Sequence, residues 1–433
     1  MKIDKKGLLG VSPLIFFLVF FVTASVIAGD FSRVSILVVF FLSTVYAVAI
    51  TKGLSLPDRV RIIGRGAGTT KMMFVAWILP CAGIFATSAS EMGCIDEAVN
   101  CLLSILPSQY IFASLFITGC FVSMATGSGI GSIVSLGPIA VGIANATGAD
   151  MSLICSIVVC GAMFGDNLSF ISDTTVIATT TQGCEMKDKF YVNIWMALPA
   201  AIVTIIIYLV LGVSTESVAV NSEINYVKVL PYILVIVMAM VGVDVLVTLL
   251  IGTLVCGVMG MAYGDFDIYG WMSAMEQGMS GMCNLIIMIL IAAGFMALIT
   301  HNGGLDYISR QCTKIIRGRR SAEMAITVLS AVTCICTADN AVAIFTIAPT
   351  AKNISEQYGI DPRRTASLMD TSACIIQELI PYSIHLLSAA AIGGVAAVTL
   401  IPYVYYPYAL FVFMVIAIVF NLPRMKPKKT KSI

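Results

Sequence analysis

Charged residues are scarce in this sequence. Lysine, arginine, aspartate and glutamate together make up 11% of its 433 residues, whereas hydrophobic residues make up 59%. Because soluble domains carry about 25% charged residues, this composition argues against a water-soluble fold. The net charge of +1 gives no sign of a basic surface, and we expect no nucleic-acid partner.

Side chains suited to catalysis and metal binding are also few. The whole chain has two histidines, which argues against a metal site or a Ser-His-Asp triad. Its thirteen cysteines form no C-x-x-C pair and are scattered through apolar runs, as is typical of small packing residues. No GxxxxGKS/T motif occurs, so nothing indicates the use of ATP. We therefore expect no enzymatic activity and no cofactor.

Long apolar runs make up much of the chain. They cover residues 11–28, 34–50, 194–213, 230–262 and 401–422. A helix needs about 20 such residues to cross a bilayer, and only helices or closed barrels satisfy their backbone hydrogen bonds there. No alternating strand pattern is present. The sequence therefore predicts an all-α polytopic membrane protein with about 10–14 membrane segments in the lipid bilayer.

The two halves of the chain share one order of helix breakers. With a shift of 211 residues, TGSGIGSIVSLGPIAVGIANATGAD (126–150) aligns with TADNAVAIFTIAPTAKNISEQYGID (337–361). Without a gap, DNLSFIS (166–172) then aligns with QELIPYS (377–383). A common order of breakers, apolar runs and polar patches indicates an internal repeat. The predicted parts are a first repeat (1–213), an external linker (214–228), a second repeat (229–422) and a basic tail (423–433).

Basic residues decide the relative orientation of the repeats, because they concentrate in cytoplasmic loops. The segment 51–71 holds five basic residues and its counterpart 262–281 holds none, whereas 94–108 holds none and its counterpart is basic. Equivalent segments therefore lie on opposite sides of the membrane, and the repeats are predicted to be inverted. Both termini are then cytoplasmic, and short interfacial helices are expected at 95–106 and 305–316.

Inverted repeats with discontinuous or re-entrant helices are typical of secondary transporters, whose sites lie near the midplane at the breaks. The stretch GDNLSFISDTT, residues 165–175, is polar where lipid is expected. A carboxylate at that depth is costly unless it faces a cavity or a partner. No lysine or arginine lies within a helical turn of Asp166 or Asp173, so we expect a bound cation or proton to compensate.

Sodium is a hard cation that takes several oxygen ligands. We expect Na⁺ at Asp166, Asn167 and Asp173, where one carboxylate can hold either Na⁺ or H⁺ and so couples their movements in opposite directions. The other candidate ligands are polar residues at the same break and at the equivalent breaks: Thr126, Ser128, Ser169, Ser172, Thr174, Thr175, Thr337, Asp339, Asn340, Gln377, Glu378 and Ser383. Glu91 and Asp370 are candidates for a proton relay.

Structural roles remain alternatives at these positions. These polar residues could cap half-helices or join helices by hydrogen bonds. Glu91 could be the solvated end of a helix, and Asp370 could form a surface pair with Arg363, two turns away. His301 and His385 suit local hydrogen bonds better than a proton relay.

Residues 165–175 resemble the NhaC family of sodium/proton antiporters, within a larger superfamily of inverted-repeat ion transporters. The glycine–aspartate pair, the following serine and the S-D-T-T run of the family match Gly165-Asp166, Ser169 and 172–175. The small-residue break of the family resembles Ala125-Thr126-Gly127-Ser128. The similarity covers most of the chain.

The second half carries further similarity and the first half two departures. Asp370 and the LIPY run at 379–382 resemble the family's acidic residue and its L-I-P-aromatic stretch. The family commonly has lysine after the GD pair and proline after the serine, where this chain has Asn167 and Phe170. The missing lysine removes a positive charge beside the predicted ion site.

The resemblance implies a Na⁺/H⁺ antiporter that works by alternating access, with Asp166 and Asp173 alternately sodium-bound and protonated. It also implies a homodimer, here expected in a prokaryotic inner (plasma) membrane. The alternative is a Na⁺-coupled carrier of an amino acid or small organic acid, because relatives of the family move such solutes. A non-transporting membrane scaffold or sensor is a third possibility, and it would tolerate Asp166→Asn.

Overall fold

The computed structural model describes residues 5–28, 33–105, 107–169, 172–213, 225–241, 243–314 and 316–423. Within these ranges the chain is helical and has no strand. Eight of its helical segments are long and apolar enough to cross a membrane, or nine if a bent pair counts as one span. The prediction of an all-α, multi-pass membrane protein is confirmed. Most of the predicted linker (214–228) and nearly all of the basic tail (423–433) lie outside the described residues.

The first half contains helices α1 to α10. Their bounds are α1 (Lys5–Ala28), α2 (Ile36–Ile50), α3 (Leu56–Ala67), α4 (Thr70–Glu91), α5 (Cys94–Ile105), α6 (Ile111–Thr126), α7 (Gly129–Thr147), α8 (Met151–Leu168), α9 (Asp173–Gln182) and α10 (Met186–Gly212). The short helix expected at 95–106 is present as α5.

The second half contains helices α11 to α21. Their bounds are α11 (Leu230–Met240), α12 (Val245–Tyr263), α13 (Ile268–Gly281), α14 (Cys283–His301), α15 (Gly304–Thr313), α16 (Arg319–Thr337), α17 (Asn340–Tyr358), α18 (Pro362–Gln377), α19 (Ile384–Gly393), α20 (Ala397–Leu400) and α21 (Tyr405–Phe420). The short helix expected at 305–316 is present as α15.

Helices of the two halves correspond in order and in the backbone conformation of the residues that end them. The turn between α6 and α7 contains Gly127 in the left-handed region (φ 62°), and the turn between α16 and α17 contains Ala338 there (φ 55°). Contacts are exchanged between the halves: α4 packs on α12 and α13 while α14 packs on α2 and α3, and α7 packs on α19 while α17 packs on α9. Exchanged contacts of this kind are what a two-fold relation between the halves produces.

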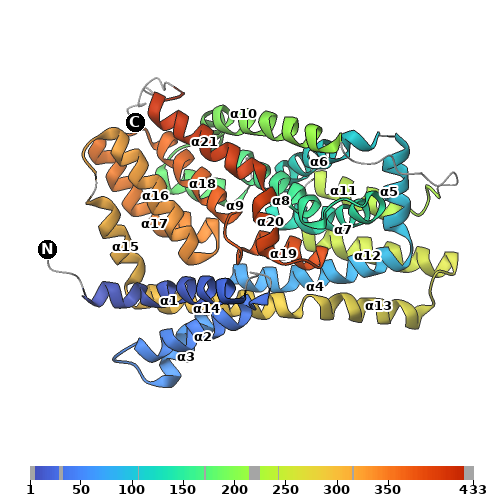
Figure 1. Cartoon of the computed structure of the whole chain (residues 1–433), viewed down its shortest axis with the longest axis horizontal. Coiled ribbons are helices and arrows are strands. Elements are labelled where there is room, and N and C mark those ends of the chain that lie inside the picture. Colours follow the sequence, from blue (N-terminus) through green and yellow to red (C-terminus); the bar gives the residue numbers. More distant parts are fainter. Residues whose placement is uncertain are drawn as a thin grey trace, which may run out of the picture.

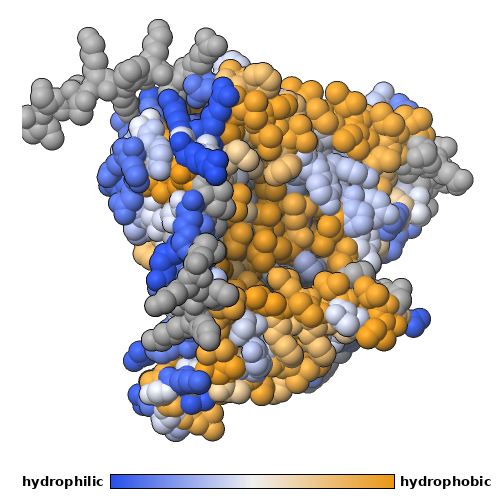
Figure 2. Space-filling view, turned by 60° about the vertical axis from the view of Figure 1, so that its left-hand side comes forward, coloured by the Kyte–Doolittle hydropathy of each residue, from blue (hydrophilic) through white to orange (hydrophobic). Residues whose placement is uncertain are grey.

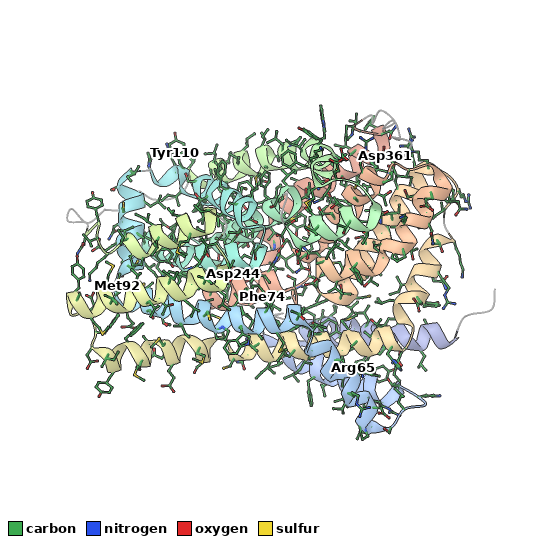
Figure 3. All side chains as sticks on the ribbon, turned by 180° about the vertical axis from the view of Figure 1, so that it is seen from behind. Arg65, Phe74, Met92, Tyr110, Asp244 and Asp361 are labelled. Carbon is green, nitrogen blue, oxygen red and sulfur yellow. The ribbon has the colours of Figure 1, made fainter. Side chains whose placement is uncertain are left out.

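The two helical hairpins enter the molecule from opposite ends. Helices α6 and α7 pack together, as do α16 and α17. Tyr110, which precedes α6, lies at the opposite end of the molecule from Asp361, which follows α17 (Figure 3). The same view places Arg65 at the end of Asp361 and Met92 at the end of Tyr110. The halves are therefore inverted with respect to each other.

The helices form two layers. In Figure 1, α1, α4, α13 and α14 lie along the lower side, and α6 to α10, α16 to α18 and α21 lie above them. Tyr382, between α18 and α19, joins the layers: its ring centroid lies 4.9 Å from that of Phe17 and 5.3 Å from that of Phe40. The molecular surface is broadly hydrophobic, with hydrophilic residues gathered toward the left edge of Figure 2. This surface is typical of a protein enclosed by lipid.

Candidate functional site

Four interruptions of helices meet at the centre of the molecule. They lie between α6 and α7, α8 and α9, α16 and α17, and α18 and α19. A cavity of about 380 Å³ is lined by residues next to all four breaks, among them Ser128, Asp166, Asp173, Asp339, Gln377 and His385. Predicted site residues from both halves therefore face one space.

Polar side chains at these breaks start the half-helices that follow them. Ser128, Ser172, Asp339 and Ser383 occupy the cap positions of α7, α9, α17 and α19. Each accepts a hydrogen bond from the backbone N–H three residues on, at 3.1, 3.3, 2.8 and 3.2 Å respectively. Such caps satisfy amide groups that a helix start leaves free. The capping alternative therefore holds for these four residues, whatever else they do.

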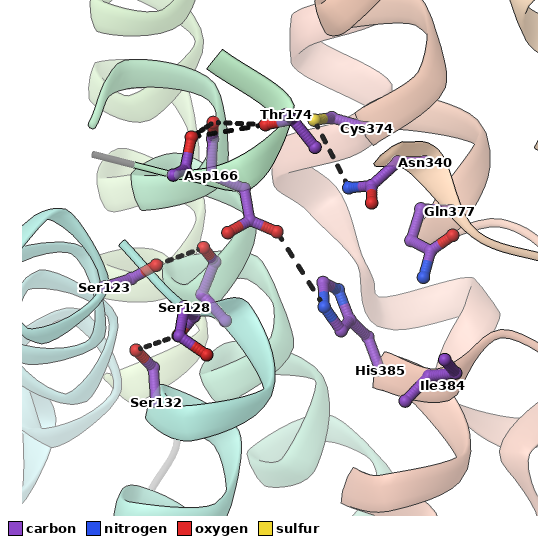
Figure 4. A network of polar contacts seen from close by, with 12 residues as sticks. Ser123, Ser128, Ser132, Asp166, Thr174, Asn340, Cys374, Gln377, Ile384 and His385 are labelled. Carbon is purple, nitrogen blue, oxygen red and sulfur yellow. Dashed lines mark hydrogen bonds and ion pairs between the residues drawn. The ribbon is translucent and has the colours of Figure 1, made fainter. Parts of the chain in front are cut away.

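Asp166 lies in the last turn of α8 and is 4% exposed. Its Oδ2 is 3.8 Å from Nε2 of His385, and the dashed line in Figure 4 joins these two side chains. The other ring nitrogen of His385, Nδ1, contacts Oε1 of Glu378. Oε2 of Glu378 is buried and has no hydrogen-bond partner within the described ranges. One imidazole thus lies between two buried carboxyl groups, an arrangement that can hold and transfer protons.

The start of α7 also faces this pair. A Cβ added at Gly129 would lie 2.7 Å from Oδ2 of Asp166 and 2.6 Å from Cε1 of His385, so only glycine leaves room there. The positive end of the α7 dipole therefore approaches the Asp166 carboxylate and stabilises negative charge on it. Ser172 and Thr174 donate to the main-chain oxygen of Asp166, at 3.0 and 3.2 Å, and hold the unwound end of α8.

A second polar cluster lies beside the first. Nζ of Lys189, on α10, is 2.7 Å from Oδ2 of Asp370, and the two side chains are 1% and 0% exposed. The amide nitrogens of Asn167 and Asn193 lie 3.4 and 3.2 Å from the same carboxylate oxygen. Asp370 is therefore neutralised inside the protein. The alternative that it pairs with Arg363 is wrong, because Arg363 pairs with Asp361 at 2.7 Å.

Comparison with protein families fits this architecture. A family model described as "Na⁺/H⁺ antiporter family" matches residues 2–213 and 215–422 of this chain. The chain belongs to the Na⁺/H⁺ antiporter family. Together with relatives named NhaC, this match confirms the resemblance to NhaC proteins.

Several relatives of this antiporter-family chain are known. The Na⁺/H⁺ antiporter NhaC of Alkalihalophilus pseudofirmus is 24% identical, over 78% of this chain and 79% of the relative. NhaC of Bacillus subtilis is 21% identical over 76% and 80%, and a malate-2H⁺/Na⁺-lactate antiporter of the same organism is 21% identical over 70% and 71%. Among solved structures, the YdaH transporter of Alcanivorax borkumensis covers 95% of this chain and 99% of its own, with a TM-score of 0.43 and 14% identity.

Most of the remaining predicted residues of this family member lie at or near the breaks. Asp173 and Asn340 line the central cavity, and Thr337 and Asp339 line a neighbouring one. The side chain of Asn167 turns away from Asp166 toward Asp370, and Ser169 donates to the main-chain oxygen of Met124 at 2.9 Å. Glu91 is exposed at the end of α4, beside Met92, which Figure 3 places at one end of the molecule.

Two side chains at the centre of this antiporter-family fold were not predicted as site residues. His385 aligns with Thr174 in the repeat, so the alignment gave it no acidic or basic counterpart. Lys189 follows Asp173 by 16 residues, too far along the chain for local spacing to pair it with the site. The ammonium group of Lys189 lies 3.1 Å from the main-chain oxygen of Asn167, so a positive charge is present beside the break although the residue after Asp166 is not a lysine. Within the described ranges, no group of three or more His, Cys, Asp or Glu side chains is placed to hold a metal ion.

A larger cavity leads toward the same centre. It has a volume of about 510 Å³ and lies between α3, α14 and the hairpin of α16 and α17. Arg65 lines it, and Figure 3 places Arg65 at the end of the molecule that also carries Asp361. Asp339 lines both this cavity and the central one. This cavity therefore extends from near one end of the antiporter-family fold to the helix breaks.

Proposed function

We propose that this protein exchanges Na⁺ for H⁺ across the membrane, and that Na⁺ at Asp166 competes with a proton carried by the neighbouring His385. The observation that carries this proposal is the burial of the Asp166 carboxylate in a cavity where four helix breaks meet. A carboxylate inside a membrane protein needs a cation or a proton to compensate its charge. Asp173 lines the same cavity and supplies further carboxylate oxygens for Na⁺.

Competition between the two ions follows from the position of His385. A protonated imidazole compensates Asp166 at 3.8 Å, and Na⁺ bound to that carboxylate would lie next to the imidazolium. Two unit charges about 4 Å apart repel by roughly 4 kcal/mol at an effective dielectric constant of about 20. Because about 1.4 kcal/mol is a factor of ten, this repulsion makes joint occupancy roughly a thousandfold less favourable. Na⁺ binding therefore releases the proton, and proton binding releases Na⁺.

Access to the site alternates between the two sides. The 510 Å³ cavity extends to the end that carries Arg65 and Asp361, which basic residues assign to the cytoplasm. We place both termini on that side of a prokaryotic inner membrane. The inverted hairpins supply an equivalent route on the other side when the two layers move against each other.

Reconstituted vesicles test this proposal. A Na⁺ gradient is imposed without organic solute, and internal pH is followed with a pH-sensitive dye; choline replaces Na⁺ in the control. We expect Na⁺ to drive proton movement and choline to drive none, and we expect Asp166→Asn to abolish the signal. Proton movement of normal size in Asp166→Asn would overturn the proposed site.

A second candidate function is Na⁺-coupled transport of a small organic acid. The volume of the larger cavity, about 510 Å³, falls within the range of small-molecule sites, and its lining includes the guanidinium-bearing Arg65. A relative is named as a malate-2H⁺/Na⁺-lactate antiporter. In the vesicle experiment, silence until malate, lactate or an amino acid is added would favour this second function over simple ion exchange.

A further inference from the structure

The ammonium group of Lys189 lies in a cage of oxygen atoms. Its Nζ is 2.7 Å from Oδ2 of Asp370, 2.5 Å from Oγ1 of Thr175 and 3.1 Å from the main-chain oxygen of Asn167. A carboxylate, a hydroxyl and a carbonyl freed at a helix break are the ligand types that hard cations bind in transporters. The cage is therefore chemically a cation site, and a lysine fills it.

A side-chain amide also contacts the atoms of this cage. Asn193, one turn after Lys189 on α10, donates through Nδ2 to the main-chain oxygen of Asn167 at 2.9 Å and to Asp370 at 3.2 Å. Its Oδ1 is buried and without a hydrogen-bond partner in the part of the chain that is described. If Lys189 were removed and this amide turned over, so that Oδ1 rather than Nδ2 faced the cage, its oxygen would be a further ligand for a small cation.

Two buried carboxylates thus lie near the end of α8: Asp166 belongs to this helix, and Asp370 contacts its residue Asn167. Asp166 turns toward the central cavity and His385, whereas the next residue, Asn167, turns toward Asp370. The carboxylate at the cavity is available to a mobile cation. The carboxylate at Asp370 already has a cation that is covalently part of the chain and 1% exposed.

We propose that Lys189 is a built-in cation that occupies a second cation site at Asp370 and so limits the protein to one Na⁺ per cycle. This inference rests on the proposed binding of Na⁺ at Asp166. It predicts that removing the ammonium group, while leaving the carboxylate, creates a site for a second Na⁺.

Equilibrium binding of ²²Na⁺ to the purified full-length protein tests this. We expect one Na⁺ per chain for the wild type, one for Lys189→Arg, two for Lys189→Met, and one for Lys189→Met combined with Asp370→Asn. If the wild type binds one Na⁺, a single Na⁺ bound by folded Lys189→Met would overturn the inference. Failure of the proposed function gives a different pattern, because the wild type would then bind no Na⁺ while Lys189→Met would bind one.

Stability measurements cover the case in which Lys189→Met folds poorly, since it leaves a buried carboxylate without its partner. Thermal unfolding is followed in NaCl and in choline chloride at equal ionic strength. We expect Na⁺ to raise the midpoint of Lys189→Met more than that of the wild type or of the variant that also carries Asp370→Asn. Equal Na⁺ dependence in all three would overturn the inference.

Discussion

At the scale of the residue, the site depends on how two neighbouring side chains are partnered. Asp166 and Asn167 are adjacent in sequence, yet the first faces an imidazole and the second faces a lysine–aspartate pair. Both settings compensate a buried carboxylate, but by different means. The imidazole of His385 lines the central cavity, whereas the ammonium group of Lys189 is 1% exposed and already paired with Asp370. The surroundings of Asp166 therefore suit the exchange of mobile cations, whereas those of Asp370 suit a permanent pair with Lys189.

His385 gives a prediction at this scale. His385→Gln keeps a polar side chain beside Asp166 but cannot carry a proton, so we expect Na⁺-driven proton movement in vesicles to fall at least about tenfold. Equilibrium Na⁺ binding should persist, because Asp166 is unchanged. His301→Gln controls for the loss of an imidazole, since His301 lies at the exposed end of α14 and lines the larger cavity but not the central one. Equal exchange rates for His385→Gln and the wild type would contradict the proposed role.

At the scale of the element, close packing positions the end of α8. A Cβ added at Gly165 would lie 2.1 Å from Oγ of Ser123 and 2.3 Å from its carbonyl carbon, so α6 and α8 touch at that point. Oγ of Ser123 in turn donates to the main-chain oxygen of Ala162. The equivalent contact joins Cys334 to Ala373 in the second half, at 3.3 Å. Each hairpin is thus fixed directly against the broken helix beside it.

Gly165→Ala tests this packing. The added methyl group cannot be accommodated without moving α6 away from α8, and overpacking of this kind costs about 1–3 kcal/mol. We therefore expect a lower midpoint of thermal unfolding and loss of exchange in vesicles. Gly64→Ala is the control, because a Cβ at that position of α3 meets no atom within 4 Å. It should be neutral or slightly stabilising, by up to about 1 kcal/mol. Equal stability of the two variants would contradict the packing argument.

At the scale of the whole molecule, inversion of the halves places equivalent helix breaks opposite one another. The hairpin tips then approach the centre from both ends, and the central cavity takes its lining from both halves. Neither half alone contains the Asp166–His385–Glu378 cluster, because Asp166 comes from the first half and the other two residues from the second. The site therefore requires the complete two-fold arrangement.

Labelling from the two sides of the membrane tests this topology. Asn145 and Glu356 occupy equivalent positions near the ends of α7 and α17, and both are exposed. Cysteine is introduced at one or the other position in a Cys283→Ser background, since Cys283 is an exposed native thiol. We expect an impermeant maleimide to label Asn145→Cys in intact cells and Glu356→Cys only after permeabilisation. Labelling of both from the same side would contradict the inverted topology.

Sequence by itself determined the class of fold and the position of the breaks. Local properties of the chain are enough for both. They are the lengths of the apolar runs, the uneven distribution of basic residues among the loops, and the capping residues Ser128, Ser172, Asp339 and Ser383. Only the tertiary structure decided which side chains meet. Asn167 and Asp370 are 203 positions apart, and the repeat alignment does not pair them. Helix packing alone brings His385 to Asp166 and Lys189 to Asp370, and leaves Glu91 at the end of α4.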